Sequence, residues 1–430
     1  MALPARALDL SEAFGLALNR DPRFAGMRFE REAEQEVLRQ AWAGVLPSFN
    51  AEGVYTETSQ DIISSDNTVF GSGKSDFPTT EYTLTLTQPL IDYAAFMNIK
   101  RARALARGAD KELAAARQDL AVRVATAYFA VLGALDRLAA TRAEEASVAR
   151  NYELVDERFK QGLSTRTEYY DAKARLADVM ANRLAVESDL DDARQALEEI
   201  IGSPAGDLAP LRDEIPLISP DPADAGVWID AAVKQNPALE AVRQTAEAAR
   251  QDIRRQRAAH YPVLNLEANH NWTETEGTLF GGGSEVETTE YLFRLNLPLY
   301  QGGVVSARTR EAIQRLNSSL QEEERQTRAL ERETRAAYFG VGTSIERVVS
   351  YREAVEAQRL AVEGKVEGHR SGLFTILAVL DGERDLSLAR QNFAMARYDY
   401  IVNSLILKKT SGILGDTDIV AVNEWLNSQP

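Results

Sequence analysis

The sequence of 430 residues contains no cysteine, which excludes disulfide bridges, thiolate metal clusters and thiol nucleophiles. Its three histidines, His260, His270 and His369, do not have the spacing of metal ligands, so we expect no metal site. The sequence also offers no Ser/His/Asp order, no phosphate-binding glycine loop followed by lysine, and no carboxylate pair placed for acid-base chemistry. We therefore expect a protein that is not an enzyme and that needs no cofactor.

Positive charge is also scarce. The chain has 49 Lys and Arg residues against 65 Asp and Glu residues, which gives a net charge of -16. A nucleic-acid-binding protein needs a basic surface to neutralise phosphates. We therefore expect no nucleic-acid partner.

Long apolar runs are missing. A membrane-spanning helix needs about 20 consecutive apolar residues, and the most apolar candidate, 120–135, is interrupted by Arg123, which predicts a packed helix. The segment 1–14 lacks the apolar region of a signal peptide. We expect either a cytosolic protein or a mature chain from which a targeting segment has been removed.

The sequence repeats itself at an offset of about 210–215 residues. Matching segments are Asn19–Pro22 and Lys234–Pro237, Glu81–Leu90 and Glu290–Leu299, Ala127–Phe129 and Ala337–Phe339, and Gly162–Leu163 and Gly372–Leu373. The predicted organisation is a first repeat at 9–202, a linker at 203–223, a second repeat at 224–412 and a C-terminal tail at 413–430.

Each repeat is expected to contain a helix, two strands, a very long helix and a return helix. The first helix should run without a break from near Ser11, or near Asp224 in the second copy, and end before Pro47 or Pro262. The long helix and its return helix form a hairpin, predicted at about 94–200 and 304–411. Each long helix would extend on the order of 100 Å.

A seven-residue apolar spacing explains how such long helices are held together. Val341, Val348, Val355 and Val362 recur at this spacing, which is typical of a coiled-coil seam. Small and polar residues between them, such as Ser344, favour a wide bundle with a wet side. Gly162 and Gly372 suit the left-handed conformation that ends a helix.

Four segments alternate apolar and polar residues as half-buried strands do, near 47–57, 81–90, 262–272 and 290–299. Each is about 9–11 residues, the length of a tilted strand that crosses a bilayer. The loops between them, 57–80 and 273–289, should be exposed. The residues that we expect to face lipid are Leu84, Leu86, Leu264, Leu266, Phe293 and Leu295. The alternative is a soluble sheet whose apolar face packs on the helices.

Four strands cannot enclose a water-filled lumen, and lipid does not tolerate open strand edges. We therefore expect a homotrimer whose chains share one 12-stranded β-barrel. The fold class is an α+β membrane protein with an internally duplicated helix-strand-strand-long-helix-helix unit, in which a long α-helical barrel continues the β-barrel.

The duplicated plan, the strand ends 82–90 and 291–300, and the segments around 159–163 and 372–381 resemble the TolC family of outer-membrane channel-tunnels. The resemblance covers about 9–412. It implies a trimer in the outer membrane of Gram-negative bacteria, with a tunnel through the periplasm. It also implies a periplasmic adaptor and an inner-membrane ABC or proton-driven transporter as partners.

The resemblance implies two sites at the hairpin tips. Adaptor docking would involve Gly162, Leu163, Gly372 and Leu373, and the periplasmic gate would involve Thr167, Glu168, Asp171, His369, Phe374 and Asp381. The family usually has Tyr and Arg where this chain has His369 and Phe374, so the closing bonds must differ. Asp381 matches one constricting Asp, whereas Ala378 stands where a second is usual.

The expected function is export through a tripartite complex across the periplasm and the outer membrane. The absence of cysteine argues against the lipid-anchored efflux branch and favours type I protein secretion. Multidrug or small-molecule efflux is the alternative within transport. A soluble coiled-coil scaffold is the alternative of a different class.

Overall fold

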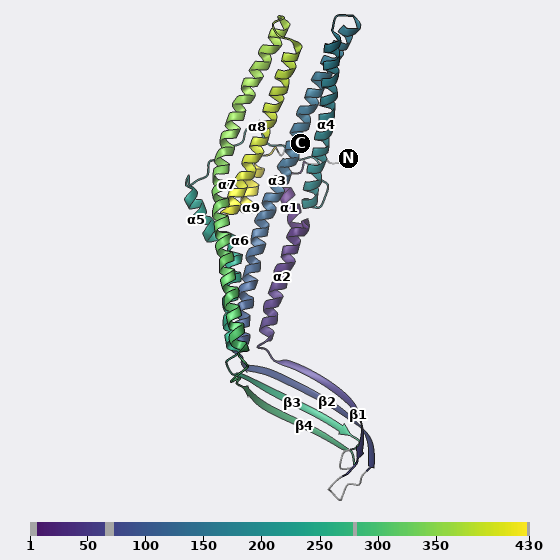
Figure 1. Cartoon of the computed structure of the whole chain (residues 1–430), viewed down its shortest axis with the longest axis vertical. Helices are drawn as coiled ribbons and strands as arrows, with labels where there is room; N and C mark the ends of the chain where they lie inside the picture. Colours follow the sequence, from purple (N-terminus) through teal and green to yellow (C-terminus); the bar gives the residue numbers. More distant parts are fainter. Residues whose placement is uncertain (1–6, 65–72, 278–281, 428–430) are drawn as a thin grey trace. The chain divides into compact units, whose positions relative to one another are not determined.

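The computed structural model describes residues 7–64, 73–277 and 282–427 (Figure 1). These residues form two compact units. The helical unit comprises residues up to 30, 110–240 and 324 onward, and the sheet unit comprises 31–109 and 241–323. The elements are α1 Leu10–Arg20, α2 Pro22–Ala43, β1 Ser48–Ile62, β2 Gly73–Ile91, α3 Tyr93–Lys160, α4 Arg166–Ile201, α5 Ala225–Gln235, α6 Pro237–Ala258, β3 Val263–Thr275, β4 Ser284–Asn296, α7 Val304–Arg370, α8 Ile376–Thr410 and α9 Asp416–Asn423.

The first helix of each repeat is broken in two, so the prediction of one continuous helix was wrong. α1 ends at Arg20 and α5 ends at Gln235, and the residues that follow them, Asp21 and Asn236, have extended dihedral angles. Each precedes a proline, which disfavours the helical conformation of the residue before it. The Asp21 and Asn236 side chains also cap the next helix, since they accept hydrogen bonds from the backbone N–H groups of Phe24 and Leu239.

The four strands form one antiparallel sheet in the order β1-β2-β3-β4. The pairing of β2 with β3 joins the two repeats. The strands are 13 to 19 residues long, so the predicted 9 to 11 residues were too few. The extra residues lie where loops were expected, because polar Thr, Ser and Glu residues continue the pairing beyond the apolar section. The loop parts 65–72 and 278–281 lie outside the described residues.

The core of the helical unit joins both hairpins to segments that were predicted as linker and tail. Its fully buried side chains include Leu10, Leu120, Tyr128, Leu197, Ile201, Tyr400, Ile401, Leu405, Ile419 and Leu426. The linker pairs with the N-terminal segment through a bridge between Leu8 and Leu208, and with the C-terminal segment through Leu211 and Leu426. The Tyr128 hydroxyl lies within hydrogen-bonding distance of the carbonyls of Leu8 (3.0 Å) and Ala209 (2.8 Å). The linker and the tail are therefore structural parts of this core.

The apolar section of α3 lies in the same core. α3 is long and apolar enough in one section to span a membrane, but most of that section is buried inside the protein. Leu120, Val124 and Tyr128 are completely buried there, which agrees with the prediction of a packed helix.

The predicted seam on α7 is buried at Val341 and Val348 and half-buried at Val355 and Val362. The polar seam residue Ser344 accepts a hydrogen bond of 2.8 Å from Nδ2 of Asn403 on α8. A buried polar seam residue is thus satisfied by the return helix of its own hairpin.

Candidate functional site

One face of the sheet is apolar along most of its width. Directly opposed residues of antiparallel strands share a face, and the register pairs Phe49 with Leu86 and Leu86 with Ala268. It also pairs Leu266 with Phe293 and Leu264 with Leu295. All six residues expected to face lipid therefore lie on this face, which we call the apolar face. Phe293 and Leu295 keep 71% and 65% of their surface exposed, so no described segment of the chain covers them.

The opposite face of the sheet is polar. Thr83 donates a hydrogen bond of 3.2 Å to Asn271 across β2 and β3. The guanidinium of Arg294 forms two hydrogen bonds, of 3.1 and 3.0 Å, with the carboxylate of Glu267 across β3 and β4. One wet face and one apolar face are what a barrel strand needs between a lumen and lipid.

In the described sheet, β1 and β4 each have one neighbouring strand, so each has an open edge. An open edge presents unpaired backbone N–H and C=O groups, which lipid cannot solvate. The single chain therefore does not form a closed barrel.

The tips of both hairpins have the same hydrogen-bonded turn. Gly162 and Gly372 have φ angles of +72° and +79°, in the left-handed region that favours glycine. The backbone N–H of Leu163 donates to the carbonyl of Arg158, and that of Leu373 donates to the carbonyl of Gly368. These are the bonds of a Schellman motif.

Leu163 and Leu373 are left exposed by these turns, at 64% and 79% of their surface. A Schellman motif is often accompanied by an apolar contact to one of the last helical residues. The residues at those positions are Glu157 and Arg158 in α3, and Glu367 and Gly368 in α7. Since none of them is apolar, the contact that usually explains an apolar residue after a glycine cap is missing at both tips.

Each tip is held together by other side chains. In the first hairpin the rings of Phe159 and Tyr169 stack with centroids 4.8 Å apart. In the second hairpin Phe374 folds over Gly368, where a Cβ atom would lie only 2.3 Å from the ring. The two exposed leucines are therefore not needed to hold the tips.

The expected gate residues are at the tips, and two of them, Glu168 and His369, are engaged within their own hairpins. Glu168 completes a capping box at the start of α4, where it accepts hydrogen bonds from the Ser164 hydroxyl (2.6 Å) and the Thr165 backbone N–H (2.8 Å). These bonds hold the pKa of Glu168 below its ordinary value. Nδ1 of His369 lies 2.9 Å from the carbonyl oxygen of Phe374. The described residues show no bond between Glu168 and His369 within one chain.

The other expected gate residues lie on the first turns of the return helices. Thr167 and Asp171 are exposed on α4. Asp381 on α8 is half exposed and lies 3.8 Å from the guanidinium of Arg175 on α4. Arg175 also lies 3.9 Å from Glu144 on α3. Nothing in the residue pattern marks Arg175, because its spacing resembles that of an ordinary solvated helix face.

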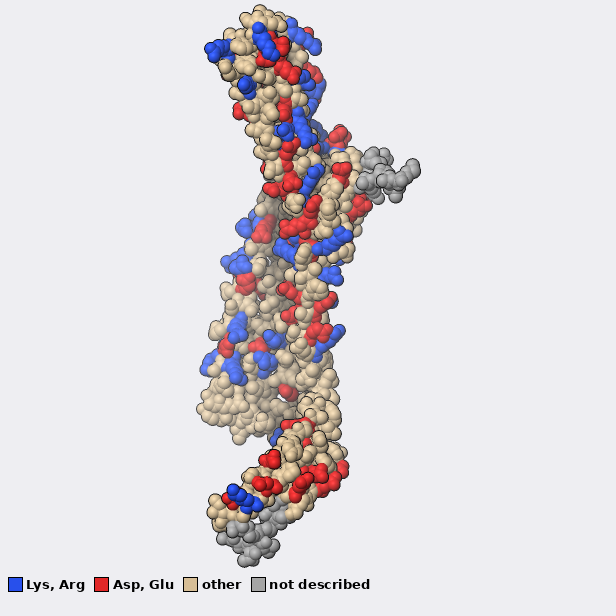
Figure 2. Space-filling view, turned by 90° about the vertical axis from the view of Figure 1, so that its right-hand side faces the viewer, with Lys and Arg blue, Asp and Glu red and all other residues tan. Residues whose placement is uncertain are grey.

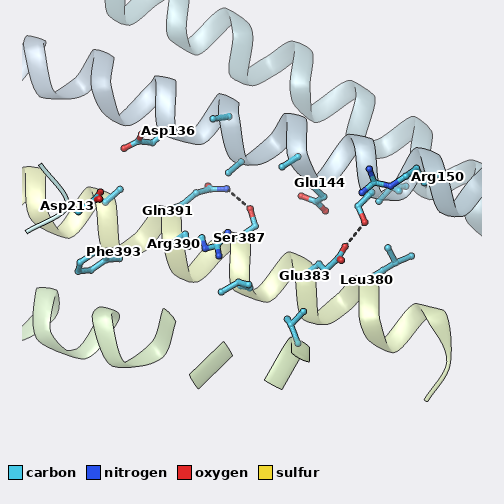
Figure 3. A pocket seen from close by; sticks show the side chains of 18 of the residues that line it. Asp136, Glu144, Arg150, Asp213, Leu380, Glu383, Ser387, Arg390, Gln391 and Phe393 are labelled. Carbon is cyan, nitrogen blue, oxygen red and sulfur yellow. Dashed lines mark hydrogen bonds between the residues drawn. The ribbon is translucent and has the colours of Figure 1, made fainter. Parts of the chain in front are cut away.

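A groove of about 800 Å³ separates α3 from α8 further from the tips (Figure 3). Its α3 wall is lined by the small side chains of Ala139, Ala140 and Ala143. Glu383 of α8 accepts a hydrogen bond from the Ser147 hydroxyl of α3 across the groove. The two hairpins of one chain therefore meet through polar contacts.

Comparison with known proteins identifies the family. The family described as outer membrane efflux protein matches residues 13–203 and 228–412. TolC of Vibrio cholerae is 31% identical over 98% of this chain and 94% of its own length. The alkaline protease secretion protein AprF of Pseudomonas aeruginosa is 29% identical over 97% of this chain and 87% of its own.

Solved structures show the same fold. The CmeC outer membrane channel of Campylobacter jejuni superposes with a TM-score of 0.81 at 16% identity, covering 97% of this chain and 90% of that one. The outer membrane protein VceC of Vibrio cholerae superposes with a TM-score of 0.74 at 20% identity, covering 94% of this chain and 96% of that one. The family match and the similarity to TolC exclude a soluble scaffold and a cytosolic protein. The chain belongs to the outer membrane efflux protein family and is a TolC-like channel protein of the outer membrane, not an enzyme.

Proposed function

We propose that three copies of this chain form a tunnel that exports proteins for a type I secretion system across the periplasm and the outer membrane. The observation that carries this choice is the coverage of relatives named for secretion. AprF and the proteases secretion protein PrtF of Dickeya chrysanthemi match 97% and 99% of this chain. The efflux-named protein BepC of Brucella suis matches 59% of this chain, and OprJ of Pseudomonas aeruginosa matches 63%.

The open edges of the sheet support a trimer. If β4 of one chain pairs with β1 of the next, three chains close a 12-stranded barrel and leave no unpaired backbone in lipid. The apolar face then contacts lipid, and the face with Thr83, Asn271 and Glu267 lines the lumen. The cost of an open edge in lipid is the driving force for this assembly.

The exposed leucines support docking at the hairpin tips. Gly162 and Gly372 force the chain to turn, and Leu163 and Leu373 extend from these turns without an intrachain partner among the described residues. A periplasmic adaptor that receives both leucines in apolar pockets would bury surface that now contacts water.

The polar groups near the tips support a gate. The polar residues Thr167, Glu168, Asp171, His369 and Asp381, together with the apolar Phe374, would close the periplasmic end by contacts between neighbouring chains. Because these groups are exposed, the closing contacts are weak enough for a docked partner to break.

Crosslinking in the native host tests the proposal. Cells that express the chain with an affinity tag are crosslinked, and the inner-membrane protein that co-purifies with the trimer is identified by mass spectrometry. Recovery of an ABC transporter with an adaptor supports type I secretion. Recovery of a proton-driven drug transporter, with drug sensitivity but normal protein secretion in a strain lacking the chain, would assign multidrug efflux instead.

A further inference from the structure

Exposed aromatic side chains gather where the strands of the sheet unit join its helices. They are Trp42 at the end of α2, Tyr93 and Phe96 at the start of α3, and Tyr261 and Tyr300 beside β3 and β4. The rings of Tyr93 and Tyr261 meet edge to face with centroids 5.3 Å apart. Aromatic rings with a polar group are favoured at the boundary between hydrocarbon and water. This group marks the level at which the apolar face ends.

Three of the four helix segments beyond this aromatic level, in α3, α6 and α7, are strongly basic, whereas the last 16 residues of α2 hold three basic and four acidic residues. The last 16 residues of α6 and the first 16 residues of α3 and α7 hold twelve basic residues and three acidic residues, in a chain where acids outnumber bases. We call these basic residues the basic collar: Lys100, Arg101, Arg103, Arg107, Arg243, Arg250, Arg254, Arg255, Arg257, Arg308, Arg310 and Arg315. The acidic residues among them are Glu247, Asp252 and Glu311. In the view of Figure 2, acidic side chains predominate over the sheet, and the adjoining helix segments show basic side chains interspersed with acidic ones.

Half of the collar carries charge that the chain does not neutralise. Lys100, Arg103, Arg107, Arg257, Arg308 and Arg310 are exposed. Within the described residues, none of these six has an acidic side chain within ion-pair distance. Exposed unpaired cations next to an apolar surface are free to bind an external anion.

A groove between α3, α6 and α7 concentrates this charge. It has a volume of about 560 Å³ and four arginines in its wall, Arg101, Arg255, Arg308 and Arg315. Asp252 lies 2.8 Å from Arg255 and 3.8 Å from Arg101, and Glu311 lies 2.6 Å from Arg315. Two carboxylates against four guanidinium groups leave the groove positive. Guanidinium groups bind phosphate oxygens through paired hydrogen bonds.

We propose that the basic collar binds the phosphodiester headgroups of anionic phospholipids in the inner leaflet of the outer membrane. The order along the sheet unit is apolar strands, aromatic residues, then unpaired cations, which is the order of hydrocarbon, interface and headgroup in a bilayer. Basic residues near an anionic membrane surface are attracted to its headgroups. The proposal rests on the membrane insertion of the strands that is part of the proposed function.

The test uses the purified full-length trimer in a neutral detergent. Native mass spectrometry measures the binding of phosphatidylglycerol, of zwitterionic phosphatidylcholine and of inorganic phosphate. The collar variant is Arg103→Gln, Arg257→Gln, Arg308→Gln, which changes one exposed unpaired cation on each helix. The matched control is Lys173→Gln, Lys234→Gln, Arg335→Gln, which removes the same charge from exposed positions of the helical unit.

We expect the parent and the control to bind phosphatidylglycerol at least ten-fold more tightly than phosphatidylcholine, and the collar variant to lose most of that preference. An equal affinity of all three proteins for the two lipids would overturn the proposal. Inorganic phosphate that competes equally well would also overturn it, because the site would then recognise a free anion. Conductance in phosphatidylcholine bilayers distinguishes a failure of the lipid-binding proposal from a failure of the proposed channel function. A collar variant that conducts like the parent has kept the channel function. A parent that does not conduct would reject the channel function itself.

Discussion

Arg175 on α4 lies 3.8 Å from Asp381 on α8, so its guanidinium links the first hairpin of the chain to the second. Glu144 on α3, 3.9 Å away, shares the same guanidinium. The resemblance to the family matched Asp381 to one of the Asp residues that constrict the pore. The structure gives it a positive neighbour, which reduces the field that it can exert on ions in the pore.

We expect Arg175→Gln to raise the cation selectivity of the channel and Asp381→Asn to lower it, because a ring of carboxylates favours cations. The double variant should behave like Asp381→Asn. Reversal potentials in planar bilayers under a salt gradient measure this. Arg137→Gln is the control, since it breaks an ion pair of 3.0 Å with Asp189 inside the first hairpin. Unchanged selectivity in both single variants would remove Asp381 from the constriction.

Charged residues at the hairpin tips should prevent docking. We expect Leu163→Glu with Leu373→Glu to abolish crosslinking to the adaptor and to stop secretion, because a buried unpaired carboxylate costs several kcal/mol at an interface. Blue native electrophoresis should show an intact trimer. The control is Leu184→Glu with Leu360→Glu, since both leucines are similarly exposed away from the tips. Normal secretion by the tip variant would reject the docking role.

The closed gate should depend on His369 and Glu168. Nδ1 of His369 lies 2.9 Å from the carbonyl oxygen of Phe374, so Nε2 is left to contact a neighbouring chain. Hydrogen bonds from Ser164 and Thr165 hold the pKa of Glu168 below its ordinary value, so this side chain is a charged acceptor at the tip.

The variants His369→Phe and Glu168→Gln should each raise the conductance of the channel without its partners, because each removes a polar group from the closing contacts, and the double variant should not differ further. Single-channel recordings in planar bilayers test this. If both single variants conduct like the parent, His369 and Glu168 do not form a gate.

The two faces of the sheet should differ in their tolerance of charge. We expect Leu266→Arg or Leu295→Arg to impair membrane insertion by about 2–4 kcal/mol, because arginine at mid-membrane depth faces lipid. Asn269→Arg is the matched change on the polar face and should insert normally. Urea titration of trimers folded into vesicles measures the difference in the free energy of insertion between each variant and the parent. Equal losses on both faces would mean that the apolar face is not the lipid face.

The helical unit should lose stability in acid through Asp119 on α3. Burial raises the pKa of Asp119, but Lys409 at 2.5 Å and the guanidinium groups of Arg23 and Arg123 outweigh this effect and lower it. A lowered pKa means that the carboxylate stabilises the fold fully above its ordinary value of 3.8, and that this contribution disappears as the pH falls through the lowered value.

We expect Asp119→Asn to cost about 1 kcal/mol at pH 7 and to lose its effect in stronger acid. Thermal unfolding followed by circular dichroism at several pH values measures the difference in stability between Asp119→Asn and the parent. Asp178→Asn, an exposed position on α4, should leave the transition unchanged at pH 7. A constant difference across the whole pH range would show that Asp119 acts by packing and not by charge.

The repeated plan, the long hairpins and the two-sided strands could all be predicted from the order of the residues. These features follow from local periodicity: valines seven residues apart bury one side of a helix, and alternation places Leu264 and Leu266 on one face of a strand. The breaks at Asp21 and Asn236 were also present in the sequence as residues before prolines. They were missed because a helical pattern continues on both sides.

Only the tertiary structure decided where the non-repeating segments lie and which charges meet. Leu208, Leu211 and Leu426 look like residues of a linker and a tail, yet they are buried because α1, α3 and α8 leave an apolar surface that these segments cover. Arg175 and Asp381 are about 200 residues apart, and no periodicity relates them. Their contact depends on how two hairpins pack, and packing is a property of surfaces that residue spacing within one helix does not specify.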